Sequence, residues 1–479
     1  MASERAERLA TWAKGVGERL TGSYMDIDFD QSSEQLRDLL RRGLVRMTDL
    51  RDDPAWFFEA HRIIAAYGQG LGGGFWTRFT VQFNLFAGTV LAVGNPSQID
   101  ELNAMQDAGM LGCFGLTEKF AGVSSGMIVE TIAEFDPATR EFVISTPNDG
   151  AKKNWISQGF CADKSVVIAD LRIGGKSHGP HGFLIDFRVT RNGKKELVPG
   201  VSLADMGRKT VCNDLDNAWI KFDAVRVPYS ALLDRYAGIN EQGQLVKREK
   251  GISTMEQIGQ RLFTGRIAVA QAALVFGRTL FAKTRSYTDS KQCWAPGGLR
   301  PPLSALPQLS SVFEEADEAF SFAERYVKLC EEQLNDAIRN DRIPSTKLQD
   351  SIAVAKIRSV ETVVQLSFRL KQTVGSYALM ADSGFEGLDS MQIAKFAEGE
   401  SFVLMQKLAR DRVKNAAKVS NPVPEEKAIV DELSGGSPME WVAKADQVYH
   451  LAELVMDRTM EETTGARLPK GVARPFARL

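Results

Sequence analysis

The sequence has few cysteines and few histidines. Its 479 residues include five cysteines and four histidines. The cysteine number is odd and the positions are far apart, so the chain lacks both the even, clustered pattern of a disulfide framework and the paired spacing of a zinc site. The five are Cys113, Cys161, Cys212, Cys293 and Cys330. We therefore expect a reducing environment and no metal site.

The sequence also lacks a strong net charge and a long apolar run. Lysine and arginine number 59 against 61 aspartates and glutamates, which gives a formal net charge of -2. Such a chain has no global field that would attract nucleic acid or an anionic membrane. No apolar stretch is long enough to span a bilayer, and the first residues lack the apolar core of a signal peptide. We expect no nucleic-acid partner, no membrane span and no secretion by that route.

The hydrophobic periodicity changes twice along the chain. Between about residues 33 and 107, apolar residues recur at spacings of three and four, as at Leu36, Leu39 and Leu40, which indicates helices. From residue 112 to 228, short β-rich runs alternate with turn signals such as Arg191-Asn192-Gly193. After Lys247 the helical period returns in long segments that are typical of a bundle.

This pattern predicts an α+β fold with three domains. We expect an N-terminal α-helical domain in residues 1–110, a central antiparallel β domain in 111–235 and a C-terminal α-helical bundle in 236–479. The predicted long helices of the bundle are 258–286, 308–338, 347–375, 402–417 and 442–461. Gly68 to Gly74 formally contains a dinucleotide-binding glycine spacing, but a helical pattern precedes it, which favours a break between helices.

Three short runs carry the functional signal. They are Gly112-Cys113-Phe114-Gly115-Leu116-Thr117-Glu118, Lys153-Asn154-Trp155-Ile156-Ser157 and Ala397-Glu398-Gly399-Glu400. In order and separation they resemble the signatures of the acyl-CoA dehydrogenase and acyl-CoA oxidase superfamily. Helical, β, helical is also the domain order of that family.

The resemblance implies that FAD is the cofactor and that the first two runs form its wall. In that family the threonine of the first run lies against the flavin ring, and the following glycine approaches the cofactor phosphate. The tryptophan of the second run stacks near the flavin, and the hydroxyl two residues later bonds near N5. The corresponding residues here are Thr117, Gly122, Trp155 and Ser157. Taken alone, Trp155 fits core filling as well.

A second group of residues is similar to the part of the family that reaches the cofactor of a neighbouring subunit. The group consists of Lys291, Gln292, Gln372 and Gly375. Lysine offers a point charge for phosphate, although the arginine that the family carries is Ser290 here. The resemblance therefore implies a homodimer or homotetramer.

Glu398 is the candidate catalytic residue. Glu398-Gly399-Glu400 is similar to the family motif in which the first glutamate is the base that removes a proton next to a thioester. The resemblance also assigns Glu400 to the cofactor site. An acidic residue that favours a helix N-terminus is the alternative interpretation of Glu398.

The extended likeness over about residues 50 to 410 implies an FAD-dependent acyl-CoA oxidase, which converts an acyl-CoA to the trans-2-enoyl-CoA and reduces O2 to H2O2. Two alternatives stay open. Many oxidases lack the hydroxyl of Ser157, and the chain ends soon after Glu398, where typical oxidases add a second helical bundle. Both features favour a dehydrogenase that uses an electron-transfer flavoprotein. The departures at Val123, Ser290 and Ser376 permit a flavin-free relative with a structural or interaction role.

The last three residues are Ala477-Arg478-Leu479, which are similar to the Ser-Lys-Leu peroxisomal address. We therefore expect a peroxisomal protein if the source is eukaryotic and a cytoplasmic one otherwise.

Overall fold

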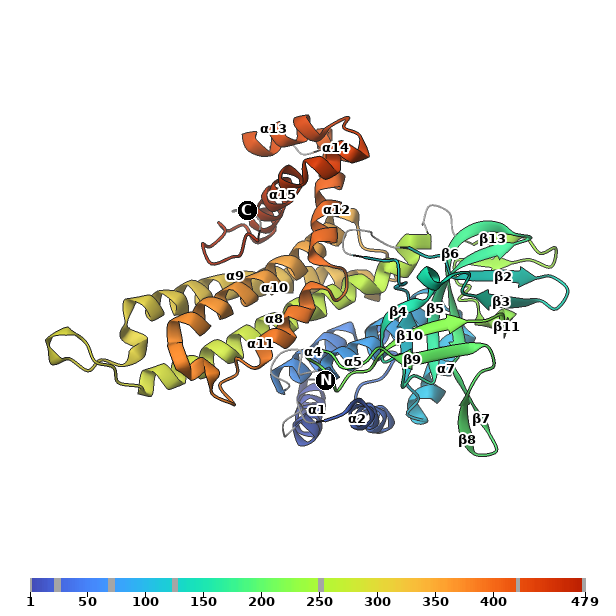
Figure 1. Ribbon diagram of the computed structural model, residues 1–479, viewed down its shortest axis with the longest axis horizontal. Helices are drawn as coiled ribbons and strands as arrows, with labels where there is room; N and C mark the ends of the chain where they lie inside the picture. Colours follow the sequence, from blue (N-terminus) through green and yellow to red (C-terminus); the bar gives the residue numbers. More distant parts are fainter. Residues whose placement is uncertain are drawn as a thin grey trace. The chain divides into compact units, whose positions relative to one another are not determined.

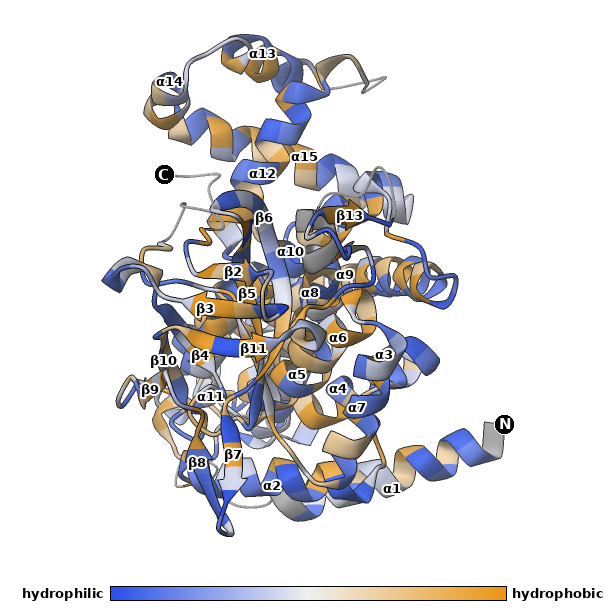
Figure 2. Cartoon of the chain, turned by 90° about the vertical axis from the view of Figure 1, so that its right-hand side faces the viewer, coloured by the Kyte–Doolittle hydropathy of each residue, from blue (hydrophilic) through white to orange (hydrophobic). Residues whose placement is uncertain are grey.

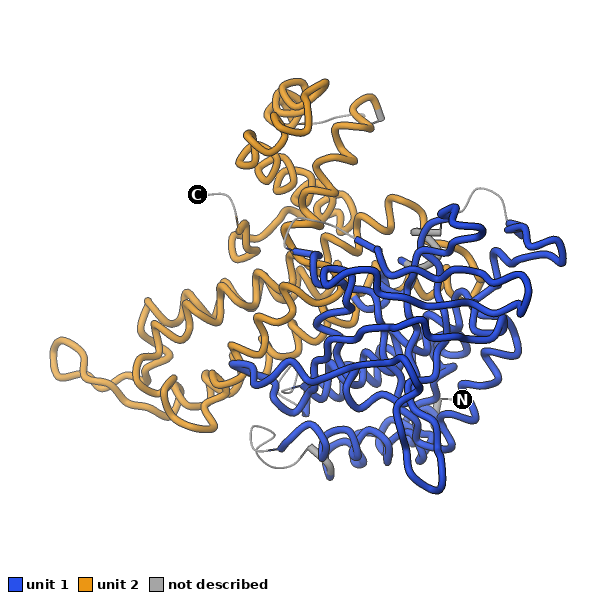
Figure 3. The backbone as a smooth tube through the Cα atoms, turned by 45° about the vertical axis from the view of Figure 1, so that its right-hand side comes forward, with its two compact units in different colours: residues 1–68, 72–265 blue, residues 69–71, 266–479 orange. Residues whose placement is uncertain are grey.

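The structure, a computed structural model, describes residues 2–20, 27–67, 74–122, 128–248, 254–418 and 423–475. The chain divides into two compact units, shown in Figure 3. Unit 1 comprises residues 1–68 and 72–265, and unit 2 comprises residues 69–71 and 266–479.

Helices form the first part of unit 1, as the leucine spacing predicts. Asp28 begins α2 with a capping box, and Asn95 does the same for α7. Leu36, Leu39 and Leu40 lie on the buried face of α2. Most of the glycine run from Gly68 lies outside the described residues. The elements are α1 (Ala2–Leu20), α2 (Phe29–Arg42), α3 (Asp49–Asp52), α4 (Pro54–Tyr67), α5 (Phe75–Thr80), the π-helical turn η1 (Val81–Phe86), α6 (Ala87–Val93) and α7 (Pro96–Asp107).

A six-stranded sheet and three smaller pairings complete unit 1 (Figure 1). The large sheet has the order β1 (Gly112–Gly115), β5 (Lys164–Ile173), β2 (Ile132–Asp136), β3 (Glu141–Ser145) and β11 (Val225–Pro228), with β6 (Lys176–Asp186) also paired to β5. The three-stranded sheet has the order β4 (Lys153–Ser157), β10 (Asn217–Phe222) and β9 (Val201–Asp205). Two further two-stranded sheets pair β7 (Arg188–Arg191) with β8 (Lys194–Leu197) and β12 (Ala237–Ile239) with β13 (Leu245–Lys247).

The large sheet is mixed rather than wholly antiparallel. Strand β5 pairs in parallel with both β1 and β2, whereas the remaining pairs are antiparallel. Parallel neighbours need a long crossover, and here other strands lie between β1 and β5 in the chain. The alternation of apolar residues does not report strand direction, so the expectation of an antiparallel domain was wrong for these two pairs. The α+β fold class is confirmed.

The core of unit 1 joins its helices to its sheets. Its strands are largely hydrophobic, as the orange colour of β3 and β5 shows in Figure 2. Buried polar contacts add to this packing, because Arg78 of α5 pairs with Asp216 at 2.9 Å and both side chains are fully buried. Gln82 of η1 accepts hydrogen bonds from the Gly112 amide at 2.8 Å and from Gln158 at 2.9 Å. The π-helical turn thereby fixes the start of β1 and the end of β4. The domain boundaries at residues 110 and 235 stay a prediction.

Unit 2 is a helical bundle. Helix α8 begins in unit 1 and continues into unit 2, where α8, α9 and α10 lie side by side (Figure 1). Gly277 of α8 allows close packing against Phe320 and Val363. The helices are α8 (Thr254–Ser290), α9 (Pro307–Arg339), α10 (Thr346–Val374), α11 (Gly387–Met391), α12 (Ser401–Lys414), α13 (Pro424–Leu433), α14 (Pro438–Ala443) and α15 (Ala445–Thr464), with 3-10 turns η6 (Gly375–Leu379) and η7 (Gln392–Lys395).

The predicted long helices are present, with one correction. The segment 442–461 is not one helix, because α14 ends at Ala443 and α15 begins at Ala445. None of the helices in the described residues is long and apolar enough to cross a membrane. Within the same residues, no three histidine, cysteine, aspartate or glutamate side chains gather as a metal site would need. All five cysteines are free thiols.

Candidate functional site

The first two sequence runs lie side by side in unit 1. After β1 the chain turns at Thr117, whose carbonyl accepts a hydrogen bond from the Asn154 amide at 2.9 Å. The next residue, Glu118, forms an isolated antiparallel bridge with Lys153 at the start of β4. Thr117 is exposed at this edge. The structure thus brings the Thr117 run and the Trp155 run together, although they are far apart in the chain.

A buried ion pair fastens the two runs. Lys153 Nζ lies 2.8 Å from Glu118 Oε1, and neither side chain is exposed. Lys153 also donates to the carbonyls of Leu116 and Ile168, at 3.2 and 2.7 Å. Burial lowers the pKa of Lys153 to about 8, against the opposing effect of the Glu118 carboxylate. Sequence analysis missed this pair, although two opposite charges, one in each of the two signature runs, were a signal that could have found it.

The Glu118 carboxylate has further donors. Thr131 donates through its amide at 3.0 Å and through its hydroxyl at 2.8 Å, and the Glu130 amide donates at 2.7 Å. Four donors around one carboxylate offset the cost of burying its charge. The pair therefore stabilises the contact between the Thr117 run and the Trp155 run.

The Trp155 side chain is exposed and is not packed in the core. Its side chain is 57% exposed, although it lies in the middle of β4. Its φ of 56° is in the left-handed region, which is uncommon for a bulky residue. The backbone amide of Trp155 donates to Met206 Sδ at 3.3 Å. The core-filling interpretation of Trp155 is therefore wrong, and the indole is available to stack on a flat ligand.

Ser157 and Gly122 complete the candidate residues of unit 1. The Ser157 hydroxyl accepts a hydrogen bond from Asn217 Nδ2 at 3.1 Å across the β4–β10 pair, which leaves its own hydrogen to be donated. Asn217 was not foreseen from the sequence. Gly122 is exposed, and a Cβ placed on it would meet nothing within 4 Å. Ser124 and Ser125, which follow it, lie outside the described residues.

Glu398 lies in the short loop of unit 2 between η7 and α12. Its φ is 56°, and the φ of Gly399 is 106°, so two consecutive residues have left-handed backbone. Such conformations persist only where neighbouring groups hold them. Arg266 of α8 supplies one contact, because its Nε donates to the Glu398 carbonyl at 2.9 Å. Burial lowers the pKa of Arg266 to about 10, while the Glu398 charge acts in the opposite direction.

Lys356, near the middle of α10, supplies further contacts to the same loop. Its fully buried ammonium donates to the carbonyls of Lys395 and Gly399, at 2.8 and 2.9 Å, and to Ser401 Oγ at 3.2 Å. Neither Lys356 nor Arg266 was singled out from the sequence. Both are cations on apolar helices, and the pattern of a helix alone does not reveal what such a residue contacts.

Glu400 caps helix α12. Its Oε2 accepts a hydrogen bond from the Val403 amide at 2.9 Å, which is the usual N-cap contact. The helix N-terminal role that we weighed for Glu398 therefore falls to Glu400, two residues later. Glu398 precedes the cap and is half-buried. A contribution of Glu400 to the cofactor site stays a prediction.

The remaining candidates of unit 2 lie near the other end of α8. Lys291 and Gln292 directly follow α8 and are exposed, and Gln372 and Gly375 stand at the end of α10. The rings of Tyr287 and Tyr377 join these two helix ends, with centroids 3.8 Å apart and planes at 7°. From Arg266 to Ser290, the last residue of α8, the helix rises roughly 36 Å, at about 1.5 Å per residue. The structure therefore groups these four residues, and within unit 2 it separates them from Glu398.

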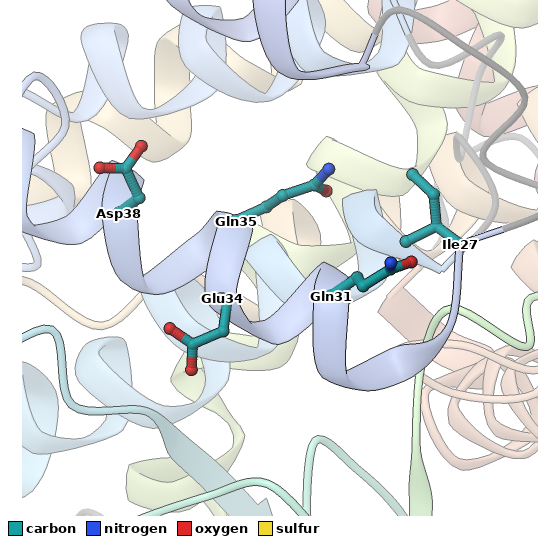
Figure 4. A pocket seen from close by; sticks show the side chains of 5 residues that line it. All are labelled: Ile27, Gln31, Glu34, Gln35 and Asp38. Atoms are coloured by element: carbon teal, nitrogen blue, oxygen red, sulfur yellow. The ribbon is translucent and has the colours of Figure 1, made fainter.

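A hollow on helix α2 lies apart from these residues. It is lined by Ile27, Gln31, Glu34, Gln35 and Asp38, and Figure 4 shows Glu34 and Asp38 pointing in different directions. None of the five is a predicted site residue.

Comparisons with known proteins agree with the sequence signatures. No family model matches the chain. The chain is 26% identical over 405 residues to the peroxisomal acyl-coenzyme A oxidase 2 of Arabidopsis thaliana, a match that covers 78% of this chain and 55% of that protein. The chain thus spans about half the length of the curated relatives it matches.

Solved structures with the same fold include oxidases and a dehydrogenase. One is acyl-CoA oxidase-2 of Caenorhabditis elegans bound with FAD, ascaroside-CoA and ATP, with a TM-score of 0.76, 18% identity, and coverage of 96% of this chain and 76% of that chain. Another is a glutaryl-CoA dehydrogenase of Mycobacterium smegmatis in complex with FADH2, with a TM-score of 0.62, 18% identity, and coverage of 86% and 96%. The predicted resemblance is confirmed: in sequence the chain is similar to acyl-CoA oxidases, and its fold is that of the acyl-CoA dehydrogenase and oxidase superfamily.

Proposed function

We propose that the protein is an FAD-dependent acyl-CoA oxidase that converts an acyl-CoA thioester to its trans-2-enoyl-CoA and reduces O2 to H2O2. The observation that carries this proposal is the Glu398 loop, where two buried cations hold a strained backbone around a motif glutamate. The relatives named acyl-CoA oxidases support the same reaction class.

The residues of unit 1 fit a flavin. Trp155 presents an exposed aromatic face, Ser157 and Thr117 carry neutral hydroxyls, and the exposed Gly122 lets a ligand approach the backbone. A flat, polar-edged ring system matches this set of donors and surfaces. When bound, FAD would supply the acceptor for the hydride, which carries the two electrons removed from the substrate.

The protein's own contribution would be orientation and a base. Glu398 would take a proton from the carbon next to the thioester carbonyl, while a hydride leaves the adjacent carbon. The two electrons and two protons removed from the substrate would finally reduce O2 to H2O2. Glu398 needs a fixed backbone for this task, because a base acts only within hydrogen-bond reach of its proton. Arg266 and Lys356 donate hydrogen bonds to the backbone of this loop.

The electron acceptor has one rival candidate. A dehydrogenase that passes electrons to an electron-transfer flavoprotein is favoured by the Ser157 hydroxyl, which many oxidases lack. A flavin-free relative with a structural or interaction role is the third alternative.

Anaerobic reduction of the purified protein by a panel of acyl-CoA thioesters tests the proposal. We expect a yellow protein whose flavin bands bleach fastest with acyl-CoA of one chain length. O2 should then reoxidise the flavin and form one H2O2 for each enoyl-CoA. Fast reoxidation by an electron-transfer flavoprotein but not by O2 would support the dehydrogenase. A colourless protein that takes up no FAD in excess would support the flavin-free role.

We also propose that the active form is a homodimer or homotetramer, in which Lys291, Gln292, Gln372 and Gly375 complete the cofactor site of a neighbouring subunit. Their grouping away from Glu398 within unit 2 supports this role. Sedimentation of the holoprotein tests it, and an FAD-bound monomer with full activity would contradict it.

The proposed location is the peroxisome if the source is eukaryotic, and the cytoplasm otherwise. The residues Ala477-Arg478-Leu479 lie outside the described residues, so the support is the sequence and the peroxisomal name of one relative. Fusion of a fluorescent protein in front of the chain, with and without these three residues, tests the peroxisomal arm.

A further inference from the structure

Lys356 is unusual among the buried cations of unit 2. Lysine is almost never fully buried without a charged partner. The ammonium of Lys356 directs its hydrogen bonds to two backbone carbonyls and one hydroxyl, all between Lys395 and Ser401. The acceptors of the buried ammonium are therefore mainly backbone carbonyl groups of this one loop.

Charged groups from four elements surround Lys356. Arg266 faces it from α8, Glu361 from α10 itself, and Glu398 and Glu400 from the loop and the start of α12. The carboxylate nearest in sequence, Glu361, is engaged elsewhere, because Lys395 of η7 pairs with it at 2.8 Å. Lys356 is therefore not the partner of a single carboxylate whose charge would explain its burial.

We propose that Lys356 is a positioning residue that holds the Glu398 loop in its left-handed conformation and thereby aims the Glu398 carboxylate. This inference rests on the proposed function only where it says that Lys356 aims the Glu398 carboxylate. That Lys356 fixes the loop can be tested whether or not Glu398 is the base.

The charge state of Lys356 determines how many acceptors it can satisfy. The protonated amine has three donors for its three acceptors, whereas the neutral amine has two. Burial lowers the pKa of Lys356 to about 7, with the Arg266 charge acting in the same direction and the three glutamates opposing it. Above that pH, Lys356 can no longer donate to all three acceptors at once.

Hydrogen exchange of the amides of residues 396–404 tests whether Lys356 holds the loop, without any activity. In Lys356→Met we expect these amides to exchange about tenfold faster or more, as the loss of a hydrogen bond to a charged group implies. Lys407→Met is the matched control, because this half-buried lysine of α12 pairs with Asp350 and Asp411 instead. Unchanged exchange of the loop in Lys356→Met would overturn the proposal.

The wild-type holoprotein provides a second measurement, for which Lys356→Met is the control. After correction for the intrinsic effect of pH on exchange, protection of the loop should fall between about pH 6 and about pH 8, with a midpoint near the Lys356 pKa of about 7. The fall should be absent in Lys356→Met. A loop whose protection is independent of pH in the wild type would contradict the role of the charge.

Single-turnover flavin reduction by an acyl-CoA tests whether Lys356 aims the Glu398 carboxylate. At about pH 6, Lys356→Met should reduce the bleaching rate by roughly 10² while the concentration of acyl-CoA that gives half the maximal rate changes less than about threefold. A slowed rate with faster loop exchange supports positioning. Faster loop exchange with a wild-type bleaching rate would show that Lys356 holds the loop but does not aim the base. A wild type that never bleaches would refute the proposed function and leave the exchange result to decide the role of Lys356.

Discussion

The buried pair Glu118–Lys153 gives the sharpest prediction for unit 1. Replacing Lys153 with Met keeps the length of the side chain and removes its charge, which leaves the Glu118 carboxylate buried without its cation. Removing one partner of a buried ion pair costs about 3–5 kcal/mol. Because the Thr131 and Glu130 donors remain, we expect the lower end, about 3 kcal/mol.

Urea unfolding of the protein, followed by intrinsic tryptophan fluorescence, measures this cost. The double variant Glu118→Gln with Lys153→Met removes both charges, so it should recover most of the loss. Lys164→Met is the matched control: its partners Glu101 and Asp186 are partly exposed, and we expect less than about 1 kcal/mol.

The same variant links the pair to the cofactor. If the pair fastens the Thr117 run to the Trp155 run, Lys153→Met should also weaken FAD binding, measured by flavin fluorescence on titration, while Lys164→Met should not. A Lys153→Met protein within about 0.5 kcal/mol of the wild type, with unchanged FAD affinity, would contradict this role of the ion pair.

Two further predictions concern stability. Gly399→Ala forces an alanine into a φ of 106°, with its Cβ 3.2 Å from Arg266 Nη2. We therefore expect the free energy of unfolding to fall by about 1–3 kcal/mol and turnover to slow. Gly259→Ala is the control, because a Cβ at this position of α8 meets open space, and this change should be neutral or stabilising. A Gly399→Ala protein as stable and as active as the wild type in urea unfolding and turnover assays would contradict this account of the loop. Burial raises the pKa of Asp214 from 3.8 to about 6, so the folded state binds its proton more tightly than the unfolded state does. This contribution, on the order of 2–3 kcal/mol, is present below about pH 4 and is lost as the pH rises through about 6. Unfolding free energies at several pH values should show this slope in the wild type but not in Asp214→Asn, and equal slopes would exclude Asp214 as its source.

Much of the fold could be predicted because it depends on local periodicity. The long helices follow from apolar spacing, and the turn at Asn192-Gly193 follows from residues that tolerate positive φ. The break at Lys444 could not be foreseen, since no glycine or proline marks it in the sequence. The parallel pairs of β5 depend on contacts between distant strands, which alternation does not encode.

The residues of the candidate site could likewise be predicted from the sequence only in part. Thr117, Trp155 and Glu398 could be selected because their motifs are short and contiguous. The groups that hold them could not, because Lys153 meets Glu118 across 35 positions and Lys356 meets Gly399 across 43. Buried lysines and arginines give no periodic signal, so the charges that fix a site are found only when the chain is folded. The capping role of Glu400 is the exception, since an acidic residue before an apolar run is a readable signal.

The central claim is that Glu398 is the base. Its most direct test is anaerobic single-turnover bleaching of the flavin by an acyl-CoA in Glu398→Gln, with Glu400→Gln as the neighbouring control. We expect Glu398→Gln to keep FAD and to bind acyl-CoA but to bleach about 10² to 10⁴ times more slowly, which is the contribution of a positioned base. Glu400→Gln should lose up to about 1 kcal/mol of stability from the helix cap and keep most of its rate. Near wild-type bleaching by Glu398→Gln would contradict the claim.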